Sequence, residues 1–387
     1  MRFPEFSGEW NKYTINDLAT VVGGGTPDTT VKSYWGGDIQ WFTPSEIGKN
    51  KYVDFSKRTI TRDGLDNSSA KLLPLHTILL SSRATVGECS IASNECTTNQ
   101  GFQSLIAKQC NIDFLYYLIQ TKKKDLIRNA CGSTFLEISA NEIRKIKVAV
   151  PVQNEQEQIA KLLSLIDERI ATQNKIIEDL KKLKCAIIEK VLNGNNANNL
   201  RLGDVGSYIR GLTYSSDDVV EYNSTLVMRS NNIVNGSLLD YQNNVVSVNK
   251  QISQEQQLQD GDIIICMANG SSALVGKSSF YDGKCISPIT VGAFCGIYRS
   301  KTAITKWLFQ TNRYRRYIWN SLQGGNGAIA NLNSEDILRM SFPLPDKQTA
   351  ERCIKLLSSL ESLIESNISL CSKFFQQKEY LLRQMFI

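Results

Sequence analysis

The stretch that decides the fold is Lys161-Leu162-Leu163-Ser164, because it recurs 194 residues later as Lys355-Leu356-Leu357-Ser358. The same offset holds without a gap over residues 138–192, which match residues 332–386. A long match at a fixed offset is the signature of a duplicated unit. The sequence of 387 residues therefore predicts two copies of one structural unit.

Upstream of this match the offset drifts, as expected where loops differ in length. Thr43-Pro44-Ser45-Glu46-Ile47 still lies over Arg229-Ser230-Asn231-Asn232-Ile233. Each half therefore combines a variable globule with a shared helical segment. We expect four segments, which are a first globule at 1–151, a helix at 152–193, a second globule at 194–345 and a helix at 346–387.

The shared segment has the pattern of a coiled-coil helix. Its apolar seam, from Ile159 to Val191, alternates steps of four and three, which is a heptad pattern. The second copy has the same seam, and polar residues interrupt both seams at the same two places. We predict that the two helices form an antiparallel pair in which Gln173 meets Asn367 and fixes the register. The alternative is that each helix lies on its own globule.

Each globule is predicted to contain both strands and helices. Apolar runs at 75–81 and 262–267 predict strands, and residues 113–128 and 304–322 predict helices. The predicted fold class is thus α+β, with two mixed α/β globules in a pseudo-twofold tandem repeat, joined by two long helices in an antiparallel coiled coil.

Composition narrows the functional classes. Lys and Arg total 44 against 38 Asp and Glu, and this net charge of +6 permits binding to nucleic acid. No apolar run is long enough to span a bilayer and the start has no leader pattern, so we expect a cytoplasmic protein with no membrane partner. The ten cysteines form no CxxC pair, which indicates reduced packing residues.

Catalytic and metal-binding patterns are missing from the sequence. His76 is the one histidine, and its place before an apolar run favours a turn leading into a buried strand. The stretch from Gly270 to Ser278 resembles a phosphate-binding loop, but five residues separate its glycines where the motif needs four. The two halves also differ most in the globules, where chemistry would have to occur. We therefore expect no catalytic residue and no metal ligand.

The globules carry loops rich in Arg, Asn, Gln and small residues, which are the side chains that read base edges and approach phosphates. These loops are residues 81–85, 97–101, 131–134, 228–232, 268–272 and 324–327. Basic clusters follow a matched Gln-Thr pair in each half, with Lys122 to Lys124 in the first and Arg313 and Arg315 in the second. The interpretation is nucleic-acid binding, and ordinary surface loops are the alternative.

Several short motifs, taken in order, resemble one family, the DNA-specificity subunits of type I restriction-modification systems. The motifs are Gly23-Gly24-Gly25-Thr26-Pro27, Trp41-Phe42-Thr43-Pro44-Ser45-Glu46-Ile47, Ser82-Arg83-Ala84-Thr85-Val86-Gly87, Thr98-Asn99-Gln100-Gly101-Phe102, and Pro151 followed by Glu155-Gln156-Glu157-Gln158-Ile159. The second half departs from this pattern, with Arg210-Gly211-Leu212-Thr213 in place of the Gly-Thr-Pro turn and no Asn-Gln-Gly-Phe.

The resemblance implies a non-catalytic subunit with two target-recognition domains, each reading one half of a bipartite double-stranded DNA site. The helices would set the spacer and dock two methyltransferase subunits, and motor-nuclease subunits would join them. In that family S-adenosylmethionine, ATP and Mg²⁺ belong to the partner subunits, so we expect no cofactor on this chain. Two alternatives stay open, a specificity subunit of a fused methylase-nuclease and a coiled-coil assembly protein without a DNA role.

Loops, basic clusters and motifs together give the candidate DNA contacts. In the first half they are Gly24, Thr26, Ser45, Ser82, Arg83, Thr85, Thr98, Asn99, Gln100, Lys122, Lys123 and Lys124, and in the second half they are Arg210, Thr213, Arg229, Asn231, Asn269, Ser271, Lys277, Arg313, Arg315 and Asn326.

Overall fold

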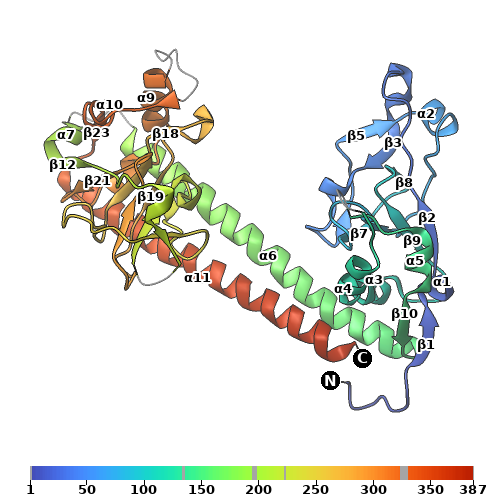
Figure 1. The fold of residues 1–387 in the computed structure, drawn as a ribbon. Coiled ribbons are helices and arrows are strands. Elements are labelled where there is room, and N and C mark those ends of the chain that lie inside the picture. Colours follow the sequence, from blue (N-terminus) through green and yellow to red (C-terminus); the bar gives the residue numbers. More distant parts are fainter. Residues whose placement is uncertain (1, 133–135, 194–197, 222–223, 323–329, 387) are drawn as a thin grey trace. The chain divides into compact units, whose positions relative to one another are not determined.

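The computed structural model describes residues 2–132, 136–193, 198–221, 224–322 and 330–386 (Figure 1). The chain divides into two compact units. Unit 1 comprises Met1–Lys175 and Ile368–Ile387, and unit 2 comprises Ile176–Asn367. Each unit contains one globule and a portion of each long helix. The expected division into four segments is a different partition of the chain and stays a prediction.

The globule of unit 1 is built on a five-stranded sheet. Its order is β2 (Ala19–Gly23), β9 (Gln103–Ala107), β6 (Ile78–Leu80), β7 (Cys89–Ala92) and β4 (Tyr52–Val53). The neighbours are antiparallel except β7 and β4, which run parallel. The apolar strand β6 is fully buried and lies at the centre of this sheet, as its sequence predicts.

Further elements complete the globule of unit 1. A second sheet has the order β5 (Arg58–Ile60), β3 (Trp35–Phe42) and β8 (Cys96–Thr98), with β3 and β8 parallel. A third pairs β1 (Asn11–Thr14) with β10 (Lys147–Val150). The helices are α1 (Ile15–Leu18), α2 (Arg62–Asp66), α3 (Ile112–Thr121), α4 (Lys123–Arg128) and α5 (Ala140–Lys145), with short 3-10 turns at Lys32–Tyr34 and Pro44–Glu46.

The globule of unit 2 repeats this topology. Its five-stranded sheet has the order β12 (Gly206–Arg210), β21 (Cys295–Ser300), β17 (Ile263–Cys266), β19 (Ser278–Phe280) and β15 (Ser237–Leu238), again with the last pair parallel. The second sheet is β13 (Val219–Val220), β16 (Val246–Val248), β14 (Thr225–Met228) and β20 (Ile289–Val291), again with β14 and β20 parallel. The five-stranded sheets share their strand order and directions, and the second sheet of unit 2 has one additional strand, β13. This correspondence confirms the predicted repeat.

The remaining elements of unit 2 are two strand pairs and short helices. The pairs are β11 (Asn198–Arg201) with β23 (Ser341–Leu344), and β18 (Ala268–Asn269) with β22 (Ala330–Asn331). The helices are α7 (Leu202–Val205), α8 (Thr305–Leu308), α9 (Asn312–Leu322) and α10 (Ser334–Leu338), with 3-10 turns at Ser216–Asp218, Ser230–Asn232 and Ser272–Leu274. The phosphate-loop resemblance therefore ends in a 3-10 turn and strand β19, and no helix opens there.

The predicted helices at 113–128 and 304–322 were wrong as single helices. The first divides into α3 and α4, and the second into α8 and α9. A matched threonine lies at each break, where the hydroxyl of Thr121 donates to the carbonyl of Leu118 and that of Thr311 to the carbonyl of Leu308. Thr311 Oγ1 also accepts a hydrogen bond from the amide of Tyr314 and so caps α9.

The two long helices are α6 (Gln153–Leu192) and α11 (Lys347–Met385). Within unit 1, Asp167 pairs with Lys378 and Asn174 with Cys371, so the numbering rises along one helix and falls along the other. The helices are therefore antiparallel, as predicted. Gln173 is buried on the seam, and Asn367 donates its amide to the carbonyl of Leu363 on its own helix. Their direct pairing stays a prediction.

Most of the cysteines pack inside the two units. All ten are free thiols, and Cys89 and Cys96 are buried within the first globule. Burial raises the pKa of both thiols to about 12, so little thiolate is present at neutral pH. His76 adopts a left-handed φ of 65° directly before β6, which confirms the predicted turn. Among the helices described, none is long and apolar enough to cross a membrane.

Thiol labelling tests this burial. Cys131 and Cys185 are exposed, so we expect a maleimide to modify them first in the native protein. Cys89, Cys96, Cys266 and Cys295 are buried and should react only after denaturation. Peptide mass spectrometry after timed labelling gives the order. Modification of Cys266 before Cys131 would contradict the fold described above.

Candidate nucleic-acid interface

Four of the five resemblance motifs of the first half converge on one place in the globule of unit 1, and the fifth begins helix α6. Three backbone hydrogen bonds join them, from Gly25 N to Thr98 O (2.8 Å), from Asn99 N to Phe42 O (3.0 Å) and from Ser82 N to Gly101 O (2.8 Å). We call the segments 23–27, 42–47, 81–85 and 98–102 the first junction. It lies where β2, β3, β6 and β8 end, so motifs distant in sequence form one surface.

The glycines of the first junction are required by packing. A Cβ atom on Gly24 would overlap the carbonyl of Asn99 and the hydroxyl of Thr98. A Cβ atom on Gly25 would overlap the backbone of Ser69 and Ala70, and the carbonyl of Gly25 accepts a hydrogen bond from the indole of Trp41 (2.9 Å). The Gly-rich motif therefore holds the domain together, which gives these residues a role independent of any ligand.

The candidate side chains at the first junction divide into buried and exposed groups. Ser82 and Thr98 are buried, and their hydroxyls have no hydrogen-bond partner among the described residues. Ser45, Thr85 and Gln100 are exposed, and Gln100 accepts a hydrogen bond from Thr26. The exposed group is the part of this surface that a ligand could contact directly.

A short turn presents Ser45 at this surface. The amide and hydroxyl of Thr43 both donate to Glu46 Oε2, at 2.8 and 2.6 Å. In return the amide of Glu46 donates to the carbonyl of Thr43 (3.0 Å), and these bonds close the 3-10 turn Pro44–Glu46. The motif around Ser45 is therefore partly explained by local folding.

Arg83 and Lys123 have acidic partners within the domain. Arg83 donates to Glu137 Oε2 from Nε (3.1 Å) and Nη2 (2.6 Å), while its side chain is 43% exposed. Lys123 pairs with Glu88, and Lys124 is exposed on α4. A DNA contact by Arg83 or Lys123 would replace its ion pair with Glu137 or Glu88. For Lys124, no ion pair is found among the described residues.

The second globule contains an equivalent junction. Leu212 N donates to Val291 O (2.7 Å), Gly292 N to Met228 O (2.8 Å) and Met267 N to Phe294 O (2.9 Å), which reproduces the three bonds of the first junction. We call the segments 210–213, 228–233, 267–271 and 291–294 the second junction. Val291-Gly292-Ala293-Phe294 thus stands where the first half has Thr98-Asn99-Gln100-Gly101. Comparison of the two halves in sequence missed this match because the two segments differ at every matched position.

The second junction carries different side chains on the same backbone. The amide of Arg229 donates to Asn232 Oδ1 (2.9 Å), which repeats the contact between Thr43 and Glu46. Asn269 donates to the hydroxyl of Ser230 (3.2 Å). The exposed candidates in this globule are Arg210, Thr213, Arg229, Asn231, Ser271 and Arg315, while Asn269, Lys277 and Arg313 are half-buried. Asn326 lies outside the described residues.

The helices that carry the two basic clusters pack differently against a pair of matched glycines. Gly87 and Gly276 are matched residues with left-handed φ angles of 89° and 80°. The side chain of Lys123 packs at Gly87, whereas Ile318 packs at Gly276. A different residue of the following helix therefore faces each junction.

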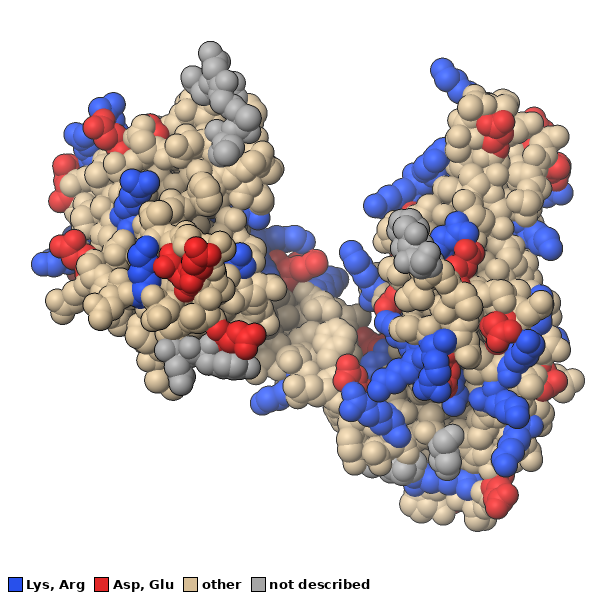
Figure 2. Space-filling view, in the orientation of Figure 1, with Lys and Arg blue, Asp and Glu red and all other residues tan. Residues whose placement is uncertain are grey.

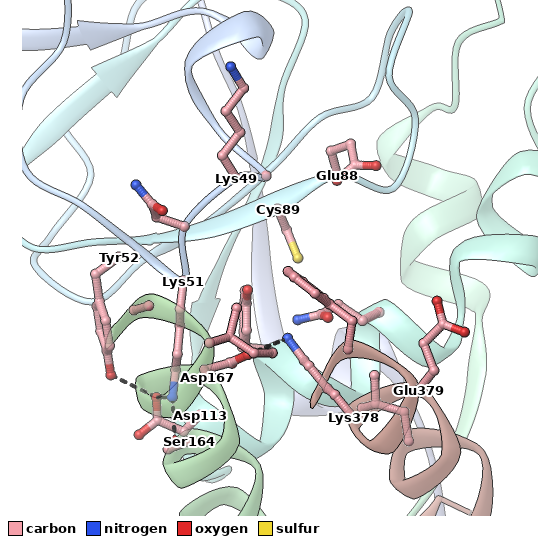
Figure 3. A pocket seen from close by; sticks show the side chains of 18 of the residues that line it. Lys49, Lys51, Tyr52, Glu88, Cys89, Asp113, Ser164, Asp167, Lys378 and Glu379 are labelled. Atoms are coloured by element: carbon pink, nitrogen blue, oxygen red, sulfur yellow. Dashed lines mark hydrogen bonds and ion pairs between the residues drawn. The ribbon is translucent and has the colours of Figure 1, made fainter. Parts of the chain in front are cut away.

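A polar cleft of about 820 Å³ lies in unit 1 between the globule and the long helices (Figure 3). Lys51 forms an ion pair with Asp113 (2.7 Å) and donates to Ser164 Oγ (2.6 Å). Lys378 pairs with Asp167 at 2.7 Å, and the hydroxyl of Tyr117 donates to the same carboxylate. Burial, with the nearby Asp167 charge, raises the pKa of Tyr117. These charges are paired internally and connect the globule to the helices.

Sequence reasoning missed this ionic cluster. Its signal was Lys378, one of the polar residues that interrupt the apolar seam. Among the described residues, no group of three or more His, Cys, Asp and Glu side chains could hold a metal ion. The arrangement found in both globules is a rigid backbone junction with exposed polar side chains around it.

The fold and the two junctions define a duplicated binding protein, with one mixed α/β globule per half and antiparallel helices. The family model for the type I restriction modification DNA specificity domain matches residues 7–182 and 195–370. The chain therefore belongs to this family.

Two relatives show how far the sequence similarity extends. The specificity subunit of the type I restriction enzyme MjaIX from Methanocaldococcus jannaschii is 39% identical over 183 residues, covering 45% of this chain and 42% of the relative. The EcoR124I/EcoR124II specificity subunit from Escherichia coli is 28% identical over 175 residues, covering 43% of each. The matched regions thus span less than half the length of these relatives.

Solved structures share the fold over the whole chain. The type I restriction-modification S subunit from M. genitalium aligns with a TM-score of 0.57 at 16% identity, covering 100% of this chain and 99% of that one. A chain from a structure concerned with complex assembly of the type I system gives 0.55 at 13% identity, covering 98% of both. At such identities the likeness concerns the fold.

A glycine substitution tests the junction. We expect Gly24→Ala to lower the free energy of unfolding by about 1–3 kcal/mol, because the added methyl group overlaps backbone and side-chain atoms of the 98–99 segment. Gly270→Ala is the matched control, since no atom lies within 4 Å of its Cβ position. Urea unfolding followed by circular dichroism measures both. Equal stability of the two variants would contradict the packing role of Gly24.

Proposed function

We propose that this chain is the sequence-specific DNA-binding subunit of a type I restriction-modification complex. Each globule reads one half of a bipartite double-stranded site, and the paired helices set the spacer between the half-sites. The observation that carries the proposal is the duplicated junction. The same backbone frame occurs in both globules, and different exposed side chains surround it. Such a design allows two different sequences to be read by one fold.

The chemistry of the exposed side chains supports base and phosphate contacts. Gln100 and Asn231 have the amide geometry that pairs with adenine edges, and Arg229 has the guanidinium that pairs with guanine. Ser45 and Thr85 suit contacts to phosphate oxygens. We infer that these residues, with Arg83 and the other candidates of the two junctions, form the DNA-reading surface.

The charge distribution also favours a polyanionic ligand. The chain carries a net charge of +6, and Lys and Arg side chains gather on the face of unit 1 drawn in Figure 2. Cationic side chains near a duplex release condensed counterions, so binding should weaken with added salt. The modest net charge suits a subunit whose affinity is supplemented by its partners.

The partners in this proposal are two methyltransferase subunits docked on the helices, with motor-nuclease subunits completing the restriction enzyme. The chain itself is non-catalytic, and S-adenosylmethionine, ATP and Mg²⁺ are placed on the partners. The relationship to named specificity subunits supports this assignment. We further propose a cytoplasmic location, which the ten free thiols support because reducing compartments preserve them.

Selection from a random duplex library tests the proposal. The chain, purified with a type I methyltransferase subunit, should enrich two short half-sites separated by one fixed gap. Enrichment of one continuous sequence would indicate that the two globules do not read separate half-sites. A stable complex that enriches no sequence and shows no salt-dependent DNA affinity would point to a coiled-coil assembly protein.

Single substitutions should separate base contacts from phosphate contacts. Arg83→Ala should relax one half-site by about 1–3 kcal/mol and leave the other unchanged. Lys124→Ala should weaken binding to all sequences equally and reduce the salt slope by about 1, because Lys124 offers only charge. Fluorescence anisotropy with matched and mutated half-sites measures both effects.

Glu137→Gln is the control for Arg83, because it removes the ion-pair charge and leaves the guanidinium in place. If Glu137→Gln reproduced the loss seen in Arg83→Ala, the effect would arise from domain structure. A uniform loss across all sequences in Arg83→Ala would make Arg83 a phosphate contact.

The helices should control the gap between half-sites. One heptad inserted between Lys175 and Ile176, with another between Ser369 and Leu370, lengthens both helices by about 10 Å at about 1.5 Å per residue. The two positions are 194 residues apart and so keep the repeat in phase. Library selection should then return the same half-sites with a gap wider by about 3 bp, taking 3.4 Å per base pair. Altered half-sites with an unchanged gap would refute the division of labour between globules and helices.

A further inference from the structure

Two lysines interrupt the apolar seams of the long helices at equivalent positions. Lys184 of α6 and Lys378 of α11 are 194 residues apart. Within unit 1, Lys378 Nζ lies 2.7 Å from Asp167 Oδ1 of α6. Within unit 2, Lys184 Nζ lies 2.8 Å from Glu361 Oε1 of α11. The acids are themselves 194 residues apart, so the same ion pair occurs once in each unit.

Both ion pairs are largely withdrawn from solvent. The exposed fractions of the side chains are 15% and 18% for Lys378 and Asp167, and 9% and 12% for Lys184 and Glu361. A charge at such a site is strongly destabilising when its partner is missing, because desolvation is then uncompensated. These pairs therefore penalise any arrangement of the helices that separates them.

Each ion pair also contacts its own globule through a matched aromatic residue. Lys378 lies 5.4 Å from the ring centroid of Tyr117, whose hydroxyl donates to Asp167 at 2.7 Å. Lys184 lies 5.3 Å from the ring centroid of Trp307, the residue that matches Tyr117 in the repeat. Figure 3 shows the pair between Lys378 and Asp167 in the cleft where globule and helices meet. The pairs thus position three elements at once in each unit.

A slip of the helices would separate both interhelical ion pairs, although Glu361 also pairs with Lys306 of its globule. Each ion pair joins residues whose numbers sum to 545, as does the contact between Asn174 and Cys371. After a slip of one heptad in either direction the lysines would lie opposite Ala160 and Ile354, or opposite Asn174 and Ile368. The acids would lie opposite Cys371 and Ile177, or opposite Met385 and Val191. The apolar seam alone would tolerate such a slip, because its heptad repeat is regular.

A parallel arrangement is penalised as well. Alignment of the two repeats in parallel would place Lys184 opposite Lys378 and Asp167 opposite Glu361. The two lysines would then face each other within the seam, and neither acid would lie opposite its lysine partner. The charge pattern therefore favours one orientation and one register, and the apolar seam favours neither.

We propose that the Asp167–Lys378 and Lys184–Glu361 ion pairs select the antiparallel register of the long helices. Trp307 and Tyr117 anchor each pair to its globule, so these six residues are positioning residues for the helix pair. Any effect of the helix register on the gap between DNA half-sites rests on the proposed function, whereas the selection of the register does not.

Native Cys371 offers a direct reporter of the register. Its Sγ lies 3.4 Å from Asn174 Oδ1, so Asn174→Cys should give an interhelical disulfide between residues 174 and 371 on oxidation. Peptide mass spectrometry of the full chain measures the fraction linked at these positions. In this background the reversal Lys378→Asp combined with Lys184→Glu should lower that fraction by on the order of tenfold, because Asp167 and Glu361 would each face a carboxylate of the other helix.

Exchange of the charges separates register selection from misfolding. Asp167→Lys with Lys378→Asp, and Lys184→Glu with Glu361→Lys and Lys306→Glu, restore opposite charges in the same register and should restore the 174–371 link. Lys306 is changed as well because it contacts Glu361. Arg383→Glu on α11 is the matched control, since Arg383 is exposed and its partner Glu379 lies on the same helix. It should leave the fraction unchanged.

The proposal is overturned if the reversed-charge chain, folded by circular dichroism, forms the 174–371 link as well as the parent does. It is also overturned if the exchanged pairs fold but do not restore the link. Neither readout uses DNA, so failure of DNA recognition would leave these results intact, and the two proposals can fail separately.

Discussion

The structure depends on covering the apolar seam of each long helix. A helix of this length in water is stable only when its apolar face packs against something. Here the residues Ile159, Leu163, Leu357 and Leu360 are buried, and each helix lies against the other and against the globules. Because the seam is regular, burial alone does not choose among registers. Buried ionic contacts repeated in the two units provide that choice.

The globules combine a fixed backbone with variable side chains. The three hydrogen bonds that form the junction recur in both halves, although Thr98-Asn99-Gln100-Gly101 is replaced by Val291-Gly292-Ala293-Phe294. Backbone bonds do not depend on side-chain identity, so the frame survives sequence divergence. Exposed positions around it are then free to change the ligand that is read. The backbone frame and the exposed surface can therefore diverge independently.

The sequence predicted the repeat, the long helices and their antiparallel order, because these follow from periodicity and a fixed offset. It did not predict the surroundings of the motif residues. Gly24, selected as a DNA contact, also has a packing explanation, Ser82 is buried, and Arg83 has an internal partner in Glu137. Burial and long-range ion pairs depend on three-dimensional neighbours, which no local spacing rule contains. For the same reason, the sequence did not predict that Lys184 pairs with Glu361 and Lys378 with Asp167.

The measurement that tests the central claim most directly is a map of methylated adenines in a host genome. The chain would be co-expressed with a type I methyltransferase subunit, and single-molecule sequencing would locate the modified bases. The account predicts new methylation within one split motif, with two short half-sites and a fixed gap. A stable complex that adds no methylation, or adds it at an unsplit motif, would contradict the assignment of one half-site to each globule.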